Sequence, residues 1–480
     1  MSVLLALVLL PALGAVGAAV HRAEAYRTAW LVTTAALHAA LVGVAWAGTP
    51  RPALGGWLAL DAAGLLTLTV VSTVFAATAV YAVGYLRRES PRGGRAFVSC
   101  LLAFLAAASL VAESHHFALL WVGLEAMTLA VAPLVFHRHD RHSLEAVWKY
   151  LVLSSVGIAL ALLGTFLLAA AQSAHPGTGR PLVLDDLVAA APRLHPGWLK
   201  AACVFLLVGF GTKMGLVPVH TWKPDTYGEA PSLVAGLMAG ALTACAFLAL
   251  TRMTQVVVAA GLGGFLTPLL LTFGLVSLGV AAVFIIGQRD LKRLLAYSSV
   301  EHMGLLTLGL GIGGTAAYGS MLHLLTNGLS KGLLFLTAGN VALARGPGAP
   351  GDRRALLRTL PLSGGLLVVG LFAVTGSPPF GTFLRMVTIV RGAFGEGHPW
   401  IGGATLLFLA IAFAGIARLI LDQAYGPPPK EARPQPRESA WLVAGPIVLA
   451  LALIVLGLYL PSALRLRLAD AAAALGGRAP

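Results

Sequence analysis

Long apolar runs separated by short polar or Pro/Gly-rich breaks fill the chain up to about residue 462. A helix needs roughly 20 apolar residues to cross a hydrocarbon core of ~30 Å. The pattern therefore predicts an all-α polytopic membrane protein with about 14 transmembrane helices. The predicted segments are 3–20, 28–48, 57–85, 97–112, 116–136, 145–172, 199–222, 229–253, 262–287, 293–313, 316–344, 361–395, 400–424 and 440–462.

Composition excludes a soluble protein. Of the 480 residues, 58% are hydrophobic and 11% are charged, whereas soluble chains are about 25% charged. The scattered Cys100, Cys203 and Cys245 exclude a disulfide scaffold and a cysteine-ligated iron–sulfur cluster. No stretch between the runs is long enough for a soluble catalytic domain. We therefore expect no cofactor or metal on this chain, and any redox chemistry on partner subunits.

The net charge of +14 reports orientation in a lipid bilayer, and we expect no nucleic-acid partner. No basic residue precedes the first run, which favours a retained helix with its N-terminus outside over a signal peptide. With alternating spans, 21 Lys and Arg residues, Lys223 among them, fall inside, and 9, Arg252 among them, fall outside. Cytoplasmic loops carry such an excess. We expect a multi-pass protein of the bacterial inner membrane with both termini on the outer side.

Several ionisable or polar residues lie within the apolar runs, where each charge costs ~2.5–3.5 kcal/mol on insertion scales. His323, Asn327 and Lys331 are four residues apart and form one stripe along a helix. Such a stripe, bridged by water, suits a proton relay, and the alternative is a set of polar contacts that lock the bundle. The relay candidates are Glu125, Lys213, His323 and Lys331, with Asn327 and Arg385 as possible members.

Four further residues are weaker candidates for relay or gating. Glu301 and His302 enter a predicted helix and could connect a relay to the inside, although no partner is visible in the sequence. His220 follows Lys213 in one interrupted segment. Lys149 pairs with Glu145 at i,i+4, which is also ordinary helix pairing.

Prolines interrupt two predicted helices, Pro218 in segment 199–222 and Pro378–Pro379 in segment 361–395. Proline leaves a backbone carbonyl without its helical hydrogen bond. Within the hydrocarbon core, such a carbonyl occurs only where it is buried in protein or lines a water-filled cavity. Each break falls in the fourth helix of a possible five-helix repeat. Five is an odd number of spans, so successive repeats would insert with opposite topology. Paired breaks in inverted repeats point to an ion pathway. The expected divisions are 1–95 (three N-terminal helices), 96–254 and 255–425 (the repeats), and 426–480 (linker, last helix and tail).

At residues 213–232, 288–299 and 376–379 the chain resembles the antiporter-like, proton-pumping subunits of respiratory complex I, group 4 membrane-bound hydrogenases and Mrp antiporters. The sequence at 298–304 and 331–340 is most similar to the F component of hydrogenase-4. The resemblance spans about 95–395 and implies fourteen helices with two inverted repeats. It also implies that Glu125 and Lys213 form a gating ion pair and that His323 and Lys331 lie on a central hydrophilic axis. Quinone, iron–sulfur or nickel–iron centres would belong to partner subunits.

The chain departs from the family pattern at three places. Asn327 replaces a second histidine, and no charge stands near Thr243, where some relatives have a lysine or asparagine. The family's lysine or glutamate after the second break aligns with Met386, and its neighbour Arg385 is rotated by ~100° around the helix. Arginine stays protonated, so it could set a barrier but not relay by releasing a proton.

Three hypotheses remain at this point. The first is a proton-translocating subunit of a complex I-like or hydrogenase-4-like complex, itself a non-catalytic part of an oxidoreductase, with membrane and peripheral partner subunits. The second is an Mrp-type subunit that exchanges Na⁺ for H⁺. The third is a structural or energy-coupling subunit that does not pump.

Overall fold

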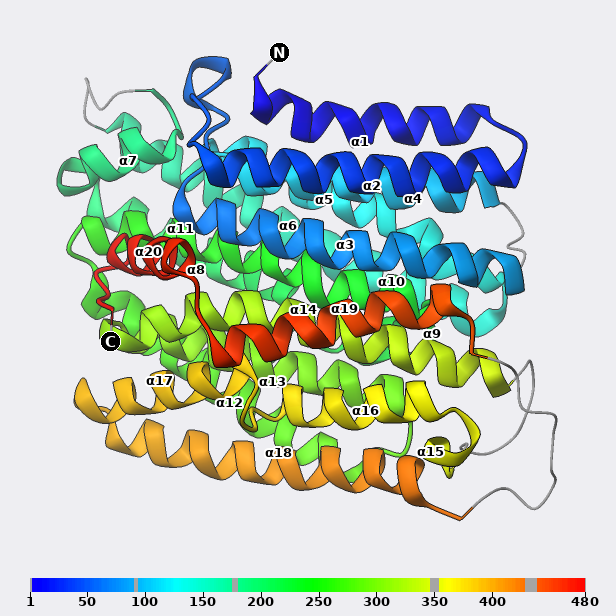
Figure 1. The fold of residues 1–480 in the computed structure, drawn as a ribbon. Coiled ribbons are helices and arrows are strands. Elements are labelled where there is room, and N and C mark those ends of the chain that lie inside the picture. Colours follow the sequence, from blue (N-terminus) through cyan, green and yellow to red (C-terminus); the bar gives the residue numbers. More distant parts are fainter. Residues whose placement is uncertain (1, 90–93, 175–179, 346–353, 428–437, 480) are drawn as a thin grey trace.

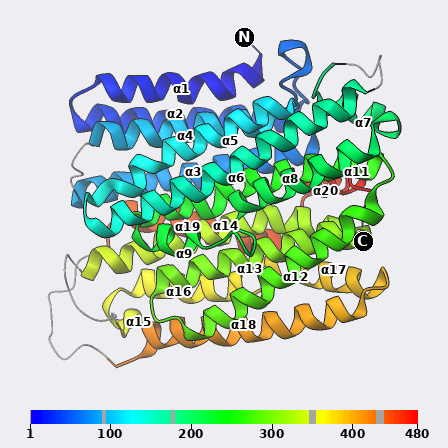
Figure 2. The ribbon, with the colours of Figure 1, turned by 180° about the vertical axis from the view of Figure 1, so that it is seen from behind.

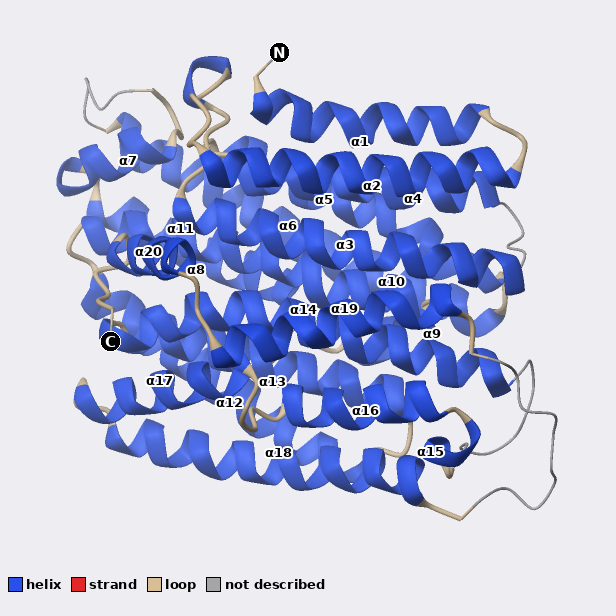
Figure 3. Cartoon of the chain, viewed as in Figure 1, coloured by secondary structure: helices blue, strands red, loops and turns tan. Residues whose placement is uncertain are grey.

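The chain forms a bundle of helices that run side by side, with α1 (Val3–Val20) at one edge and α18 (Pro399–Tyr425) at the other (Figure 1). This computed structural model describes residues 2–89, 94–174, 180–345, 354–427 and 438–479. Within these ranges the regular elements are helices, and strand pairing is limited to isolated bridges (Figure 3). The all-α prediction is confirmed. Most of the predicted linker and five predicted inside residues lie outside the described residues: Arg92, Arg353, Lys430, Arg433 and Arg437.

The N-terminal helices α1, α2 (Glu24–Ala47) and α3 (Ala62–Arg88) match the first three apolar runs. A short turn, η1 (Leu54–Gly56), precedes α3. Asp61 caps α3 because its carboxylate accepts the Gly64 N–H at 2.8 Å, which satisfies one free donor of the first turn. α3 is buried over most of its length, whereas α1 and α2 lie at the edge of the bundle (Figure 1).

A broken helix interrupts the next part of the chain. This part forms α4 (Gly94–Glu113), α5 (Phe117–Val135), η2 (Phe136–Arg138), α6 (Arg141–Ser173), α7 (Leu184–Ala190), η3 (Ala191–Arg193), α8 (Pro196–Met214), α9 (Trp222–Glu229), α10 (Ser232–Leu237), the π-helical turn η4 (Met238–Leu242) and α11 (Thr243–Ala259). α8 ends at Gly215, whose φ of 74° suits glycine. Trp222 Nε1 donates to the Thr212 carbonyl at 2.9 Å, and the Val217 N–H donates to Ser277 Oγ at 3.0 Å. Backbone groups freed at the break therefore find partners inside the protein.

The second half repeats this feature. It forms α12 (Gly263–Gly287), α13 (Leu291–Ile312), α14 (Gly314–Arg345), α15 (Leu356–Thr359), α16 (Pro361–Val374), α17 (Gly381–Gly395), α18, α19 (Ala440–Leu458) and α20 (Ser462–Ala473). The gap between α16 and α17 contains Pro378 and Pro379, and Gly376 there has a φ of 72°. α14 crosses the middle of the bundle and packs against α3, α13, α17 and α19.

Eleven helices among the described residues are long and apolar enough to cross a membrane, so the chain is a polytopic membrane protein. Seen from behind, α6, α8 and α12 cover the opposite side of the bundle (Figure 2). α1 begins toward the end of the bundle that carries α7 and α20, and the chain also finishes there (Figure 1). We call this end the α7 face.

Two predicted loop residues are buried instead. Lys223 was expected inside and Arg252 outside, yet their exposed fractions are 0% and 1%. Lys223 belongs to α9, which folds back into the bundle after the helix break, and Arg252 lies within α11. The assignment to loops was wrong for both. The apolar runs do not show how the broken helix returns to the core with Lys223, nor that Arg252, at the end of segment 229–253, points into the protein.

Candidate functional site

The last turn of α8 brings a lysine against a carboxylate from α5. Lys213 is fully buried, and its Nζ lies 3.5 Å from Glu125 Oε2. The same ammonium donates to Thr128 Oγ1, one turn further along α5, and lies 6.0 Å from the centre of the Tyr150 ring. Glu125 is 21% exposed at its side chain. The pair therefore joins a buried cation to an acid that keeps contact with the surroundings.

A second lysine lies deep in the centre of the bundle, on α14. Lys331 Nζ donates to Ser298 Oγ on α13 at 2.8 Å, and Glu301, one turn further along α13, lies within electrostatic range. Glu301 is 4% exposed, and its Oε2 has no hydrogen-bond partner among the described residues. The central lysine therefore has a buried acid on the neighbouring helix α13, which the sequence did not show.

Two histidines and an arginine form the next cluster. The rings of His302 and His323 lie edge to face with centroids 5.2 Å apart. Arg385 Nη1 contacts His302 Nδ1 at 3.4 Å and also His323 Nε2. All three side chains have 0% exposure. Asn327, between His323 and Lys331 on α14, is buried with its Oδ1 unpartnered in the described part of the chain.

Arg385 and Met386 point to different surroundings. Arg385 faces the buried histidines, whereas Met386 lines an apolar groove of about 470 Å³ between α17 and α18, with Phe383, Val387 and Leu406 nearby. A charge at position 386 would therefore face this groove. In this chain the arginine supplies the charge on the buried side of α17.

Lys149 and His220 lie apart from these clusters. Lys149 Nζ pairs with Glu145 at 2.7 Å and with Asp225 of α9 at 2.8 Å, and its side chain is 42% exposed. Asp225 also pairs with Arg293 at 3.2 Å. These ion pairs hold α9 at the surface opposite the α7 face. His220 lies in the break before α9, 9% exposed, with Nδ1 unpartnered within the described ranges.

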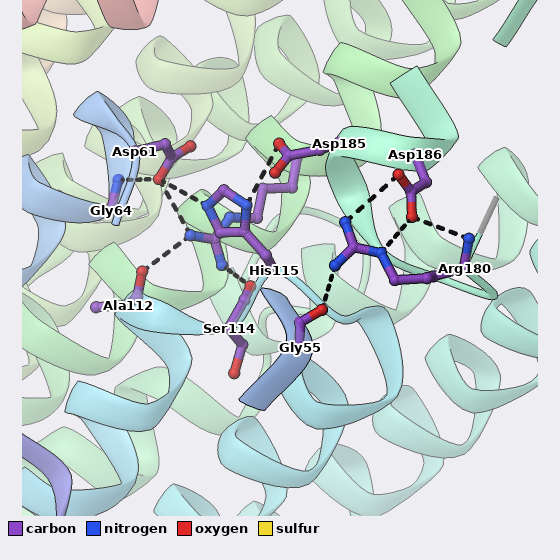
Figure 4. A network of polar contacts seen from close by, with 10 residues as sticks. Gly55, Asp61, Gly64, Ala112, Ser114, His115, Arg180, Asp185 and Asp186 are labelled. Atoms are coloured by element: carbon purple, nitrogen blue, oxygen red, sulfur yellow. Dashed lines mark hydrogen bonds and ion pairs between the residues drawn. The ribbon is translucent and has the colours of Figure 1, made fainter. Parts of the chain in front are cut away.

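The α7 face carries a separate polar network (Figure 4). Arg252 pairs with Asp61 at 3.2 Å and donates to the carbonyls of Ala112 at 2.9 Å and Ser114 at the end of α4. His115 lies between two acids, 3.7 Å from Asp61 and 3.5 Å from Asp185. The network therefore ties α3, α4, α7 and α11 together.

Beside this network, Arg180 binds Asp186 at 2.7 Å and the Gly55 carbonyl, which connects η1 with α7 (Figure 4). Sequence reasoning did not find this network. Its only signal in the sequence is the polar stretch between the predicted segments 145–172 and 199–222.

Neighbouring charges on the α7 face shift the pKa values of His115 and Asp61. Burial opposes protonation of His115, but its contacts with Asp185 and Asp61 outweigh burial, so the pKa of His115 is raised. Burial likewise opposes ionisation of Asp61, but Arg252 and His115 outweigh it and lower the pKa of Asp61. The charged forms therefore support each other.

No group of three or more His, Cys, Asp or Glu side chains in the described ranges is arranged to hold a metal ion. The family model described as NADH:quinone oxidoreductase/Mrp antiporter, TM, matches residues 114–412, which is more than half of the chain. The chain belongs to this family. The match includes both helix breaks and every buried lysine named above.

Relatives of this antiporter-family chain agree with that assignment. It is 31% identical over 390 residues to a hydrogenase-4 component F homolog of Methylacidiphilum infernorum, covering 79% of this chain and 81% of the relative. It is also 31% identical over 431 residues to NADH-quinone oxidoreductase subunit N of Desulforudis audaxviator, covering 86% and 83%. A chain of the membrane-bound sulfane sulfur reductase, an archaeal respiratory membrane complex, has the same fold, with a TM-score of 0.89, 21% identity and coverage of 98% and 97%.

Proposed function

We propose that the chain moves protons across a bacterial inner membrane as an antiporter-like subunit of a complex I-like or hydrogenase-4-like complex. The observation that carries this proposal is the fully buried Lys213 at a helix break, 3.5 Å from Glu125 on a neighbouring helix. The names of the two relatives, a hydrogenase-4 component and a quinone oxidoreductase subunit, support the kind of complex. Quinone, iron–sulfur or nickel–iron centres would lie on partner subunits.

Glu125 and Lys213 form the gate of the proposed path. When the pair is closed, Glu125 stabilises the Lys213 ammonium and keeps its proton in place, because an opposite charge at this distance favours the charged form. When the pair opens, the ammonium loses that support and can pass its proton inward. Thr128, which accepts a hydrogen bond from Lys213, keeps the amine aligned in the closed state.

Beyond the gate, Lys331 and the two histidines carry the proton along the axis. Lys331 receives the proton, with Glu301 as its buried counter-charge. His323 and His302 offer ring nitrogens that both accept and donate protons. Arg385 keeps its own proton. It acts as a fixed positive charge beside the two histidines while they exchange protons.

The membrane arrangement follows the same proposal. The eleven apolar helices, together with α13, α14 and the broken α16–α17 pair, would make fourteen spans in two inverted five-helix repeats. Gly215 and Gly376 support the repeats, since each ends the first half of a broken helix at nearly the same φ. An even number of spans puts both termini on one side, which the excess of basic residues in the opposite loops makes the outer side.

The test is proton uptake by vesicles that carry the assembled complex, measured per electron transferred. We expect Lys213→Met and Glu125→Gln to lower this ratio, whereas a substitution of the exposed Lys200 leaves it unchanged. Wild-type ratios in both gate variants would reject proton movement by this route and favour a structural subunit. Uptake that needs Na⁺ on the opposite side of the membrane would favour the Mrp-type alternative.

A further inference from the structure

A third lysine of the bundle interior has no role in the path described so far. Lys223 has 0% exposure, and its Nζ has no hydrogen-bond partner among the described residues. It is the second residue of α9, the helix that follows the break after Lys213. A buried ammonium without a paired acid is costly, so its presence in the core needs an explanation.

The surroundings of Lys223 place it on the Lys213 side of the axis. Its side chain lies against Gly215, the residue that ends α8, where an added Cβ would meet Lys223 Cδ and Cε at 2.5 Å and Nζ at 3.0 Å. The Nζ is 6.0 Å from the Trp222 ring and 5.9 Å from the Tyr227 ring. Trp222 in turn lies 5.2 Å from the Tyr150 ring, whose other neighbour is the Lys213 ammonium.

The charge of Lys223 also reaches the other side of the axis. It lies within electrostatic range of Lys331 and of His302. The hydroxyls of two tyrosines near it, Tyr150 and Tyr227, are buried without hydrogen-bond partners in the described ranges. Such groups are the ones that water bridges in protein interiors.

We propose that Lys223 is the proton-carrying link between Lys213 and Lys331. The Lys213 ammonium gives one proton to the neutral Lys223 amine through water and hydroxyl groups, and Lys223 then gives one proton to the neutral Lys331 amine. Each transfer leaves its donor neutral, and Lys213 is reprotonated from the gate side, so no electron or co-reactant is involved. A buried amine suits this task because burial disfavours the charged form and no acid holds the proton in place.

The location of α9 fits this role. Ion pairs of Asp225 with the exposed side chains of Lys149 and Arg293 hold the first turn of α9. At its other end, Lys292 donates to the carbonyls of Gly228 at 2.6 Å and Ala230 at 2.5 Å. The helix that carries Lys223 is therefore held at both ends, which keeps the amine between the two halves of the axis.

This inference rests on the proposed function, and the same vesicle assay tests it with three substitutions. Removal of a positioned proton-transfer group slows its step by about 100-fold or more, so we expect Lys223→Met to lower proton uptake per electron at least as far as Lys213→Met. Lys223→Arg keeps the charge and the aromatic contacts but holds its proton, and we expect the same loss. Lys223→His, which can titrate, should recover part of the uptake.

The control is Lys200→Met, which removes an exposed lysine whose Nζ lies 5.6 Å from the Phe265 ring. Full uptake in Lys223→Arg would mean that Lys223 is a structural cation, and full uptake in Lys223→Met would mean that it has no role; either result overturns the inference. If Lys223→Met fails to assemble, the difference between the Arg and His variants decides. Loss in Lys213→Met with full uptake in the Lys223 variants rejects only the link, whereas full uptake in both sets rejects the proposed function.

Discussion

Arg252 on α11 should be one of the most important single side chains for stability. It is 1% exposed, pairs with Asp61 at 3.2 Å, and donates to Ala112 O at 2.9 Å, Val111 O at 3.2 Å and the Ser114 carbonyl. Arg252→Met keeps much of the apolar stem but removes the guanidinium that pairs with Asp61 and donates to the carbonyls at the end of α4. Removal of one partner from a buried pair costs about 3–5 kcal/mol, so we expect a loss of that size in the free energy of unfolding.

The assay is reversible unfolding in mixed detergent micelles, with a double-mutant cycle that includes Asp61→Asn. An amide can still accept from Arg252, so Asp61→Asn alone should cost less, and the coupling energy should lie at about 1–3 kcal/mol. Arg293→Met is the matched control: its pair with Asp225 has the same 3.2 Å distance but Arg293 is 48% exposed, which predicts less than about 1 kcal/mol. A loss below about 1 kcal/mol for Arg252→Met, or equal losses for both arginines, would refute the reasoning.

Three other predictions concern pH, packing and the charge on α17. Because the pKa of His115 is raised, its protonated form stabilises the α7 face at low pH, and this support is lost as pH rises through that pKa; hydrogen exchange of α7 should then rise in wild type but not in His115→Gln. In Gly209→Ala the new Cβ would meet α6 backbone atoms at 2.6 and 2.7 Å. This should lower the free energy of unfolding by about 1–3 kcal/mol and displace Lys213, one turn away. In the control Gly43→Ala the new Cβ meets nothing within 4 Å, so both unfolding and proton uptake should stay unchanged. Arg385→Met should lower proton uptake per electron, and adding Met386→Lys should not restore it, because position 386 faces the apolar groove; recovery would contradict this placement.

The sequence predicted helix positions well because hydrophobicity is a local property. Each predicted segment contains an observed helix or a broken pair, for example segment 199–222, which holds α8 and the start of the break before α9. Lys223 was misplaced because it lies one residue past the end of segment 199–222, and Arg252 because it lies at the end of segment 229–253. Only the return of a broken helix into the core, or a network of backbone carbonyls around a guanidinium, makes such positions buried.

The site itself could be predicted in part. Charges within apolar runs made Glu125, Lys213 and Lys331 candidates, because a charge at that depth is costly, and the structure places Lys213 and Lys331 in the core. The partner of Glu301 and the inward direction of Arg385 depend on how α13, α14 and α17 are rotated against one another. That rotation follows from packing between distant segments, which a single sequence does not contain.

The proposed proton path holds more bases than acids, and under the proposed function this has a consequence for ion selectivity. Lys213, Lys223, Lys331 and Arg385 outnumber Glu125 and Glu301 as the ionisable lysine, arginine and acidic side chains described along it. A dehydrated Na⁺ ion needs several oxygen ligands and would meet repulsion from a guanidinium that never loses its charge. A proton travels as part of an amine or a ring and needs no such shell. The same surplus means that one occupied amine discourages protonation of the next, so that protons would advance singly.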